Sequence, residues 1–541
     1  MAQTLATLAV DSLIENGIDT LYCVPGVQND NLFDAIYHRQ QALRPVHARH
    51  EQGAVYMALG AALATGRPQA YSVVPGPGFL NGTAALCTAQ ALNTPLFGLV
   101  GQIPSGAVGK GYGLLHEIEG QLDIMAHLSK FAAQVTEPDQ AVAQFATAWA
   151  QTQSGRPGPV ALELPVDCWL KPVPYDPGAL HVTPLDAPQP DGTQFAEAAR
   201  LITQARTPLI VVGGGAQNQS APIRDLARRI GAGVMAFRNG HGVVPASDPL
   251  CLNMPTGHAL WAECDLVIGL GTRLMTHKQS WGIGPEQNVL HIDIDADILH
   301  RVRAPTLGLH ADLAQALPGL LDALPAQPDR SEWRQRMAEA KTRMQTDIQS
   351  ALAPQLGWLS AIRRALPEDG LFVDELTQIG FVSRFAFPVE RPRTFLSTGY
   401  QGTLGWGIAT ALGAAHARRD VPVVAIAGDG GALFTISELA TAVHHNIPLN
   451  VVVMNDNAYG NVKGIQRDTY GERYIASDLT SPDFVALAQS FGVTATRATT
   501  PEGLENALAH AIAHDGPNLI EVPVGEFPSP WSYILLPKVF E

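Results

Sequence analysis

The sequence predicts an α/β protein with three domains, each a parallel sheet flanked by helices. Short apolar runs alternate with helical stretches, as at residues 20–24, 70–74, 96–100 and 160–164. A chain of 541 residues exceeds what one hydrophobic core usually holds and fits about three domains. A proline-rich break at 171–191 and a polar break at 324–329 place these domains at residues 1–180, 181–340 and 341–541.

Composition excludes several classes of protein. Hydrophobic residues make up 46% and charged residues 16% of the chain, which indicates extensive buried surface, subunit interfaces included. A net charge of −15 argues against a nucleic-acid partner. No apolar run approaches the roughly 20 residues that span a membrane, and residues 1–17 favour an amphipathic helix over a signal peptide, so a cytoplasmic location is expected. The five cysteines form no Cys-x-x-Cys pair, which argues against a cysteine zinc site or a disulfide framework.

In the first domain, Glu51 is the first candidate for chemistry. It lies between the apolar Val46 and the apolar segment 54–59, at an expected junction of strand and helix. Burial there would favour the acid form of its carboxyl group, which suits a proton relay. The alternative is a helix N-terminal carboxylate stabilised by the helix dipole.

The second domain begins with an apolar run at 208–212 followed by three glycines, and a strand is expected near 289–297. This order is typical of nucleotide-binding domains. The glycines 213–215 lack a complete Gly-x-Gly-x-x-Gly pattern.

In the third domain, two adjacent strands end in polar residues. The apolar run 421–427 is followed by Gly428, Asp429, Gly430 and Gly431, and a helix is expected over about 434–445. The next strand, 449–454, leads into residues 455–457, Asn-Asp-Asn. Glycines and a helix N-terminus suit a phosphate group, and oxygen ligands from neighbouring strands suit Mg²⁺. The segment is therefore expected to bind a diphosphate and a metal ion together. His444 and His445 would follow as cations at the helix C-terminus.

Four segments, 49–54, 76–81, 402–407 and 428–457, together resemble the motifs of thiamine-diphosphate enzymes. The similar proteins are acetolactate synthases, pyruvate and benzoylformate decarboxylases, and benzaldehyde lyase. The resemblance implies a pyrimidine-binding, a central and a diphosphate-binding domain, the outer two being distant structural relatives. It implies a homodimer or homotetramer with active sites between subunits. FAD in the central domain is allowed by the resemblance of residues 271–273 to a flavin-contacting segment but is not expected.

The same resemblance assigns roles to individual residues. Glu51 would hydrogen-bond the pyrimidine ring, Gly402 would accept a bond from its amino group, and Leu404 would support the bent cofactor. The remaining expected cofactor contacts are Asn81, Thr377, Gln378, Gly428, Asp429, Gly430, Gly431 and Tyr459.

The expected metal ligands are Asp429, Asp456 and the backbone carbonyl of Ala458. Relatives usually have asparagine where this chain has Asp456, which adds negative charge beside an anionic diphosphate. Asn455 or Asn457 is the alternative ligand.

Substrate recognition is expected to involve Gln28 and His116, which fall near active-site positions of benzaldehyde lyase. For His116 the alternative is a surface or interface histidine. The leading function is carboligation or decarboxylation of a 2-oxo acid, in the manner of acetolactate synthases. Two alternatives remain, an acyloin lyase or carboligase and a non-catalytic cofactor-binding scaffold. The first is favoured by Gln28 and by the apolar Val74 and Phe79. The absence of a tryptophan at 461–466 argues against biosynthetic acetolactate synthesis.

Overall fold

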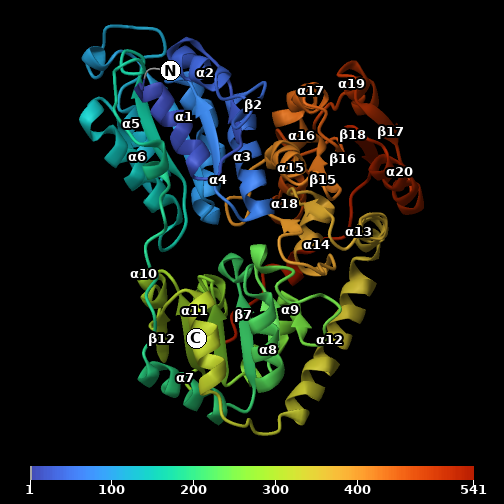
Figure 1. Ribbon diagram of the computed structural model, residues 1–541. Coiled ribbons are helices and arrows are strands. Elements are labelled where there is room, and N and C mark those ends of the chain that lie inside the picture. Colours follow the sequence, from blue (N-terminus) through green and yellow to red (C-terminus); the bar gives the residue numbers. More distant parts are fainter. Residues whose placement is uncertain (1–2) are drawn as a thin grey trace.

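A computed structural model describes residues 3–541 and contains three six-stranded sheets (Figure 1). The N-terminal part, blue to teal, and the C-terminal part, orange to red, lie side by side, and the green middle part lies beneath them. Every strand pair within the three sheets is parallel, which confirms the predicted fold class. Among the described residues, no helix combines the length and apolar character required to cross a membrane.

The N-terminal sheet has the strand order β2-β1-β3-β4-β6-β5. Its strands are β1 (Thr20–Cys23), β2 (Arg44–His47), β3 (Gln69–Val73), β4 (Leu96–Gln102), β5 (Phe131–Gln134) and β6 (Val160–Pro165). Its helices are α1 (Leu5–Glu15), α2 (Asp30–Tyr37), α3 (Glu51–Thr65), α4 (Pro77–Leu92), α5 (Gln121–Leu128) and α6 (Pro138–Gln153).

The C-terminal sheet has the order β14-β13-β15-β16-β18-β17, the same order as the first when each is counted from its own first strand. This identity supports the expected kinship of the outer domains. The strands are β13 (Leu371–Val373), β14 (Phe395–Leu396), β15 (Val423–Gly428), β16 (Leu449–Asn455), β17 (Thr494–Arg497) and β18 (Asn518–Pro523). The helices are α13 (Ala353–Ala365), α14 (Gln378–Ala386), α15 (Trp406–Ala417), α16 (Asp429–Thr435), α17 (Leu439–His444), α18 (Gly460–Tyr470), α19 (Phe484–Ser490) and α20 (Pro501–Ala513).

The middle sheet has the order β12-β11-β10-β7-β8-β9, that of a doubly wound nucleotide-binding fold. Its strands are β7 (Pro208–Val212), β8 (Gly233–Ala236), β9 (Cys251–Leu252), β10 (Leu266–Leu270), β11 (Asn288–Asp293) and β12 (Leu307–His310). Its helices are α7 (Gly192–Gln204), α8 (Ser220–Ile230), α9 (Met254–Ala259), α10 (Ala296–His300) and α11 (Leu313–Ala323).

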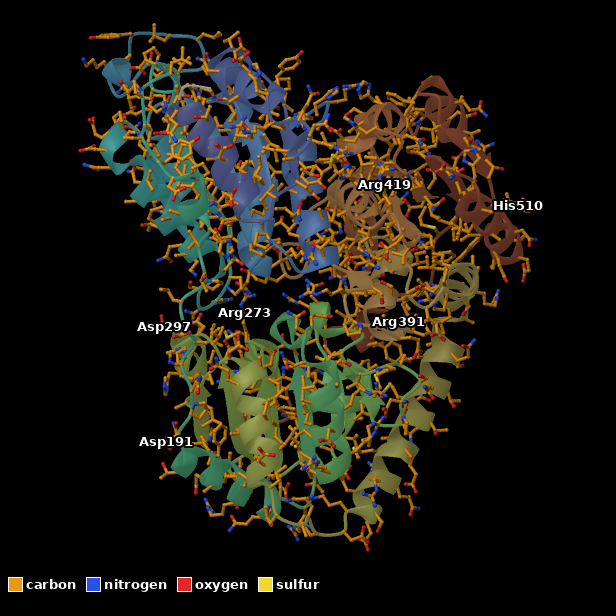
Figure 2. All side chains as sticks on the ribbon, in the orientation of Figure 1. Asp191, Arg273, Asp297, Arg391, Arg419 and His510 are labelled. Atoms are coloured by element: carbon orange, nitrogen blue, oxygen red, sulfur yellow. The ribbon has the colours of Figure 1, made fainter. Side chains whose placement is uncertain are left out.

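The glycines of the middle domain have a packing reason of their own. A Cβ atom on Gly213 would lie 2.6 Å from the carbonyl oxygen of Gly271, and one on Gly215 would lie 3.0 Å from the Cα of Gly271. The two loops at the switch in strand order therefore require small residues whether or not a nucleotide binds there. Beyond them, Arg273 reaches the N-terminal domain and donates to the carbonyl of Ala91 (Figure 2).

The outer domains share one hydrophobic core, which α3 and α15 form between them. A Cβ atom on Gly60 would clash with the backbone of Thr410, and one on Gly413 would clash with the backbone of Met57. Glycine and alanine thus let the two helices approach closely, and the N-terminal and C-terminal sheets are held together through this contact.

Helix α12 (Ser331–Ala351) connects the middle and C-terminal domains. Trp333 and Met337 pack on the middle domain and Ile348 on the C-terminal one, so residue 340 falls within a continuous helix. The C-terminal tail then returns along this side. Trp531 packs on Phe381, and the following residues bond to the backbone of Trp281. The tail thus covers its own chain.

Candidate active site

Glu51 and Asn81 meet at the carboxyl edge of the N-terminal sheet. Glu51 begins α3 directly after β2, and the side-chain amide of Asn81 on α4 donates to its carboxylate at 3.0 Å. A Cβ atom on Gly78 would lie 2.5 Å from Val74 and 3.4 Å from the Glu51 carboxylate, so the turn must be glycine. Glu51 is only half-buried in the single chain, less than its apolar flanks led us to expect.

Gln28 and His116, predicted separately, are hydrogen-bonded to each other. Nδ1 of His116 lies 3.1 Å from Oε1 of Gln28, and Nε2 of Gln28 donates to the carbonyl of Leu115 at 3.2 Å. Gln28 is 6% exposed. A Cβ atom on Gly76, at the start of α4, would clash with the backbone of His116. The pair therefore adjoins the turn that carries Gly78, next to Glu51.

Asp429 lies at the corresponding edge of the C-terminal sheet. It is the first residue of α16, is 1% exposed, and accepts a 2.7 Å hydrogen bond from the hydroxyl of Ser481. The sequence placed the helix start near residue 434, which is wrong. The helix begins at Asp429 and is interrupted before α17.

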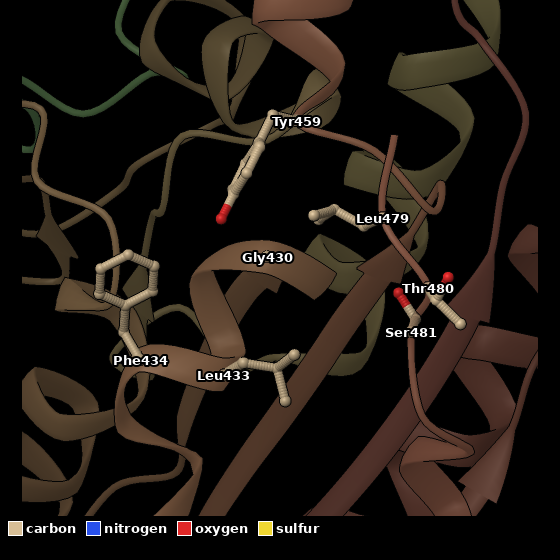
Figure 3. A pocket seen from close by; sticks show the side chains of 7 residues that line it. All are labelled: Gly430, Leu433, Phe434, Tyr459, Leu479, Thr480 and Ser481. Carbon is tan, nitrogen blue, oxygen red and sulfur yellow. The ribbon is translucent and has the colours of Figure 1, made fainter. Parts of the chain in front are cut away.

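The glycines of this helix explain the difference. A Cβ atom on Gly430 would lie 2.7 Å from the Tyr459 ring, and one on Gly431 would clash with the Glu375 carboxylate. Tertiary packing thus selects glycine inside the first turn, where helix propensity alone disfavours it. Figure 3 shows Tyr459 facing this turn across a pocket of about 350 Å³. The pocket is lined by Gly430, Leu433, Phe434, Tyr459, Leu479, Thr480 and Ser481.

Asp456 faces the same site from the end of β16. Its carboxylate accepts a 2.8 Å hydrogen bond from Gln378. Burial and the nearby charge of Asp429 raise the pKa of Asp456 to about 6. The side chain of Asn455 instead donates to Glu521 at 2.8 Å. Asp456, not Asn455, is thus the group that shares a site with Asp429.

Three further predicted cofactor residues lie in two other turns of the C-terminal domain. Thr377 caps α14 by accepting from the N–H of Gly380 at 2.9 Å, and its methyl group faces Gly428. Gly402 has a φ of 59°, a left-handed conformation that favours glycine. Leu404 follows in the same turn and is half-buried.

Glu375, which sequence reasoning missed, holds that turn in place. It is 0% exposed and accepts hydrogen bonds from the N–H groups of Gly405 and Gly407 at 2.9 and 3.0 Å. Burial raises the pKa of Glu375 to about 7, against the lowering effect of the two bonds. Its place two residues after the apolar run 371–373 was the only signal in the sequence.

Glu438, also missed, has a similar role in the N-terminal half of the site. Its buried carboxylate accepts from the N–H groups of Arg49 and His50 at 3.1 and 3.0 Å. These residues lie directly before Glu51. The C-terminal domain thereby fixes the approach to the N-terminal carboxylate.

Across residues 3–541, no hydrogen bond joins the group of Gln28, Glu51, Asn81 and His116 to the group of Thr377, Gln378, Gly402, Asp429 and Asp456.

The C-terminal half fits a divalent cation by its donor set. The two carboxylates of Asp429 and Asp456 repel each other electrostatically, and a cation between them would relieve this repulsion. Carboxylate oxygen atoms are also the ligands that Mg²⁺ prefers. Fold and site together define an α/β protein with a carboxylate pair and a glycine-rich turn at the carboxyl edge of a parallel sheet, where such folds bind their ligands.

Comparison with known proteins gives the family. Three family models match: the thiamine pyrophosphate enzyme N-terminal binding domain at 3–127, its central domain at 195–320 and its C-terminal binding domain at 377–522. A probable 2-ketoarginine decarboxylase of Pseudomonas aeruginosa is 31% identical over 536 residues, covering 96% of this chain and 94% of that protein. An acetolactate synthase large subunit of Parasynechococcus marenigrum is 32% identical, covering 96% and 87%. For isozyme 1 of Escherichia coli acetolactate synthase the values are 28%, 96% and 94%.

The chain belongs to the thiamine pyrophosphate enzyme family. It is an enzyme that uses thiamine diphosphate for carboligation or decarboxylation at a carbonyl carbon, as its three matched domains and its full-length similarity to such enzymes show.

Proposed function

We propose that the chain acts on a small 2-oxo acid, by decarboxylation or by acetolactate-synthase-like carboligation. The observation that carries the proposal is the full-length similarity to proteins named for 2-oxo acid chemistry. The Gln28–His116 pair, which lies beside Glu51 and Asn81 at one sheet edge, supplies a group for proton transfer there. The names of the similar proteins, acetolactate synthases and a 2-ketoarginine decarboxylase, support the same substrate class.

The residues present fit thiamine diphosphate. Glu51 and Asn81 would hold the pyrimidine ring, with Gly402 and Leu404 contributed from the C-terminal half. The diphosphate would bind at the turn 428–431, with Thr377, Gln378 and Tyr459 around it. When bound, the cofactor supplies a carbon nucleophile for a carbonyl group and takes up the electron pair of the broken C–C bond.

Mg²⁺ would be held by Asp429, Asp456 and the carbonyl of Ala458. Because the side chain of Asn455 is already hydrogen-bonded to Glu521, Asp456 is the better candidate for the metal ligand. A metal ion would offset the repulsion between the two carboxylates and the diphosphate.

Two side chains of this protein, Glu51 and His116, would carry out the proton transfers. Glu51 would hold or release a proton at its carboxyl group where the pyrimidine ring binds, and the bond from Asn81 orients that carboxyl group. His116 can give or take a proton at the substrate, and Gln28 fixes the orientation of its ring through Nδ1.

We also propose that a second copy of the chain completes each site. Large apolar side chains stay exposed beside both halves: Leu80 is 42% and Leu115 is 64% exposed beside Glu51, and Leu433 and Phe434 are 44% and 52% exposed at the pocket. Such patches mark interfaces. A homodimer or homotetramer would bring the Glu51 group of one copy against the Asp429 group of another.

Mixing two inactive variants tests this arrangement. In Glu51→Gln and Asp429→Asn mixtures, random pairing should restore about one quarter of wild-type activity, because half the pairs are mixed and one of their two sites is intact. If the mixture stays inactive although mixed pairs are recovered through a different affinity tag on each variant, the site lies within one chain.

Product analysis tests the reaction itself. Pyruvate, benzoylformate and benzoin are each offered with thiamine diphosphate and Mg²⁺ to the wild type and to Glu51→Gln. CO₂ release from an oxo acid, lost in the variant, is expected. Benzaldehyde formed from benzoin, with no oxo acid consumed, would instead establish the acyloin lyase.

A further inference from the structure

Three histidines meet where the N-terminal and C-terminal domains join. His47 ends β2, His444 ends α17, and His445 follows it. Figure 1 shows β2 facing α17 across this junction. The ring centroids lie 4.6 Å (His47 to His444), 4.9 Å (His47 to His445) and 4.7 Å (His444 to His445) apart. One ring nitrogen from each can be chosen so that all three lie within 4.8 Å of one another.

No acidic side chain among the described residues neutralises this cluster. Nε2 of His445 is buried without a hydrogen-bond partner, and no described acidic side chain bonds to any of the three rings. The charged neighbours are cations: Arg49 beside His47, and Arg419, which donates to the carbonyl of His445 (Figure 2).

The His445 ring therefore differs from the helix-terminal cation that the sequence suggested. Burial, then the neighbouring His47 and His444, lower the pKa of His445 to about 4. Burial, His444 and Arg49 lower the pKa of His47. His416, which also faces His445, has a pKa lowered by burial to about 4. Neutral imidazoles carry free nitrogen lone pairs, the form that binds metals.

We propose that His47, His444 and His445 form a binding site for a late first-row divalent cation, with Zn²⁺ as the best-matched ion. Imidazole nitrogen suits Zn²⁺ and its neighbours in the series, whereas Mg²⁺ prefers the oxygen ligands of the Asp429 site. Zinc–nitrogen bonds of about 2.0–2.1 Å place tetrahedral ligand atoms about 3.3 Å apart. Binding would therefore require side-chain rotations that shorten the present spacing of up to 4.8 Å to that value. The exposed His444 leaves a side open for water as fourth ligand.

A metal ion at this site would stabilise the position of the segment 47–51, which leads to Glu51. His47 precedes Glu51 by four residues, and the intervening N–H groups of Arg49 and His50 already bond to Glu438, ahead of α17. A metal ion joining β2 to α17 would hold the same segment at a second point. The cation thus acts as a positioning element outside the cofactor site.

Zn²⁺ titration by calorimetry tests the proposal on the full-length protein, with Mg²⁺ and thiamine diphosphate kept in excess so that the Asp429 site is occupied. One Zn²⁺ per chain is expected. His47→Gln and His445→Gln should each weaken binding by more than about tenfold, the lower end of what changes around metal ligands cost. His510→Gln is the matched control, because His510 is exposed on α20 and distant from the cluster (Figure 2).

Co²⁺ gives a readout independent of affinity. The visible absorption of four-coordinate Co²⁺ should appear with wild type and His510→Gln and be absent from His445→Gln. The melting temperature of each metal-free variant shows that it is folded, and His444→Gln, an exposed substitution, repeats the test with little risk to folding. Equal Zn²⁺ affinity in wild type and His445→Gln, or equal loss in His510→Gln, would overturn the proposal.

Discussion

Replacement of Glu375 by glutamine should change how stability depends on pH. The carboxylate is fully buried, and its pKa of about 7 lies above the ordinary value of 4.5. The folded protein therefore holds this proton more tightly than the unfolded chain. The stabilising contribution is complete below pH 4.5 and is lost as the pH rises through about 7.

The size of the effect follows from the shift. Each pKa unit corresponds to about 1.4 kcal/mol, so the loss between pH 4.5 and the neutral range amounts to about 3 kcal/mol. Glutamine has nearly the same shape and does not titrate. Relative to wild type, Glu375→Gln should thus gain up to about 3 kcal/mol in free energy of unfolding from pH 4.5 to about pH 8.

Urea unfolding of both proteins across this pH range measures the difference, with the fluorescence of the buried Trp406 as a nearby probe. A second readout separates stability from function. The amide of glutamine can accept only one of the two N–H bonds from Gly405 and Gly407, so the KM for thiamine diphosphate should rise. Parallel stability curves for the two proteins would refute the reasoning about the buried carboxylate.

Three further changes test other contacts of the site. Gln28→Leu and His116→Phe should be non-additive in kcat/KM, with a coupling of about 0.5–3 kcal/mol, since they remove one shared bond; additive effects in the double variant would contradict this. Asp456→Asn should weaken Mg²⁺ binding yet raise the melting temperature of the metal-free protein, because repulsion from Asp429 is removed; unchanged Mg²⁺ affinity would assign the ligand elsewhere. Glu438→Ala should destabilise by about 1–3 kcal/mol per unsatisfied N–H group and lower kcat, measured by thermal unfolding and steady-state kinetics; an unaltered kcat would remove its link to catalysis.

The sequence predicts the class of fold well because each buried parallel strand can be recognised from its own short apolar run. The strand expected at 20–24 occurs as Thr20–Cys23, and that expected at 449–454 occurs as Leu449–Asn455. Strand order is not local. Nothing in either stretch shows that the outer sheets share one order, or that Gly60 and Gly413 let α3 and α15 touch. The domain limits at 180 and 340 stay predictions.

The site is predictable where motifs carry it. Glu51 with Asn81, and Asp429 with Asp456 and Gln378, are close in the structure as the resemblance implied, and their roles stay proposals. Residues that position the site by binding backbone N–H groups of a distant segment are not predictable from motifs. Glu438 lies 389 residues from its partner Arg49. A glutamate in a helical stretch has no local sequence feature that indicates such a contact.

Two buried carboxylates perform the same task in the two halves of the site. Glu438 binds N–H groups just before α3, next to Glu51, and Glu375 binds N–H groups at the start of α15, next to Leu404. Burial of a carboxylate is costly, and burial raises the pKa of both groups. Backbone N–H groups at a helix start are unsatisfied by the helix itself, so a charged acceptor there fixes the turn firmly. Because α3 and α15 also pack on each other, a disturbance at either carboxylate should reach both catalytic turns.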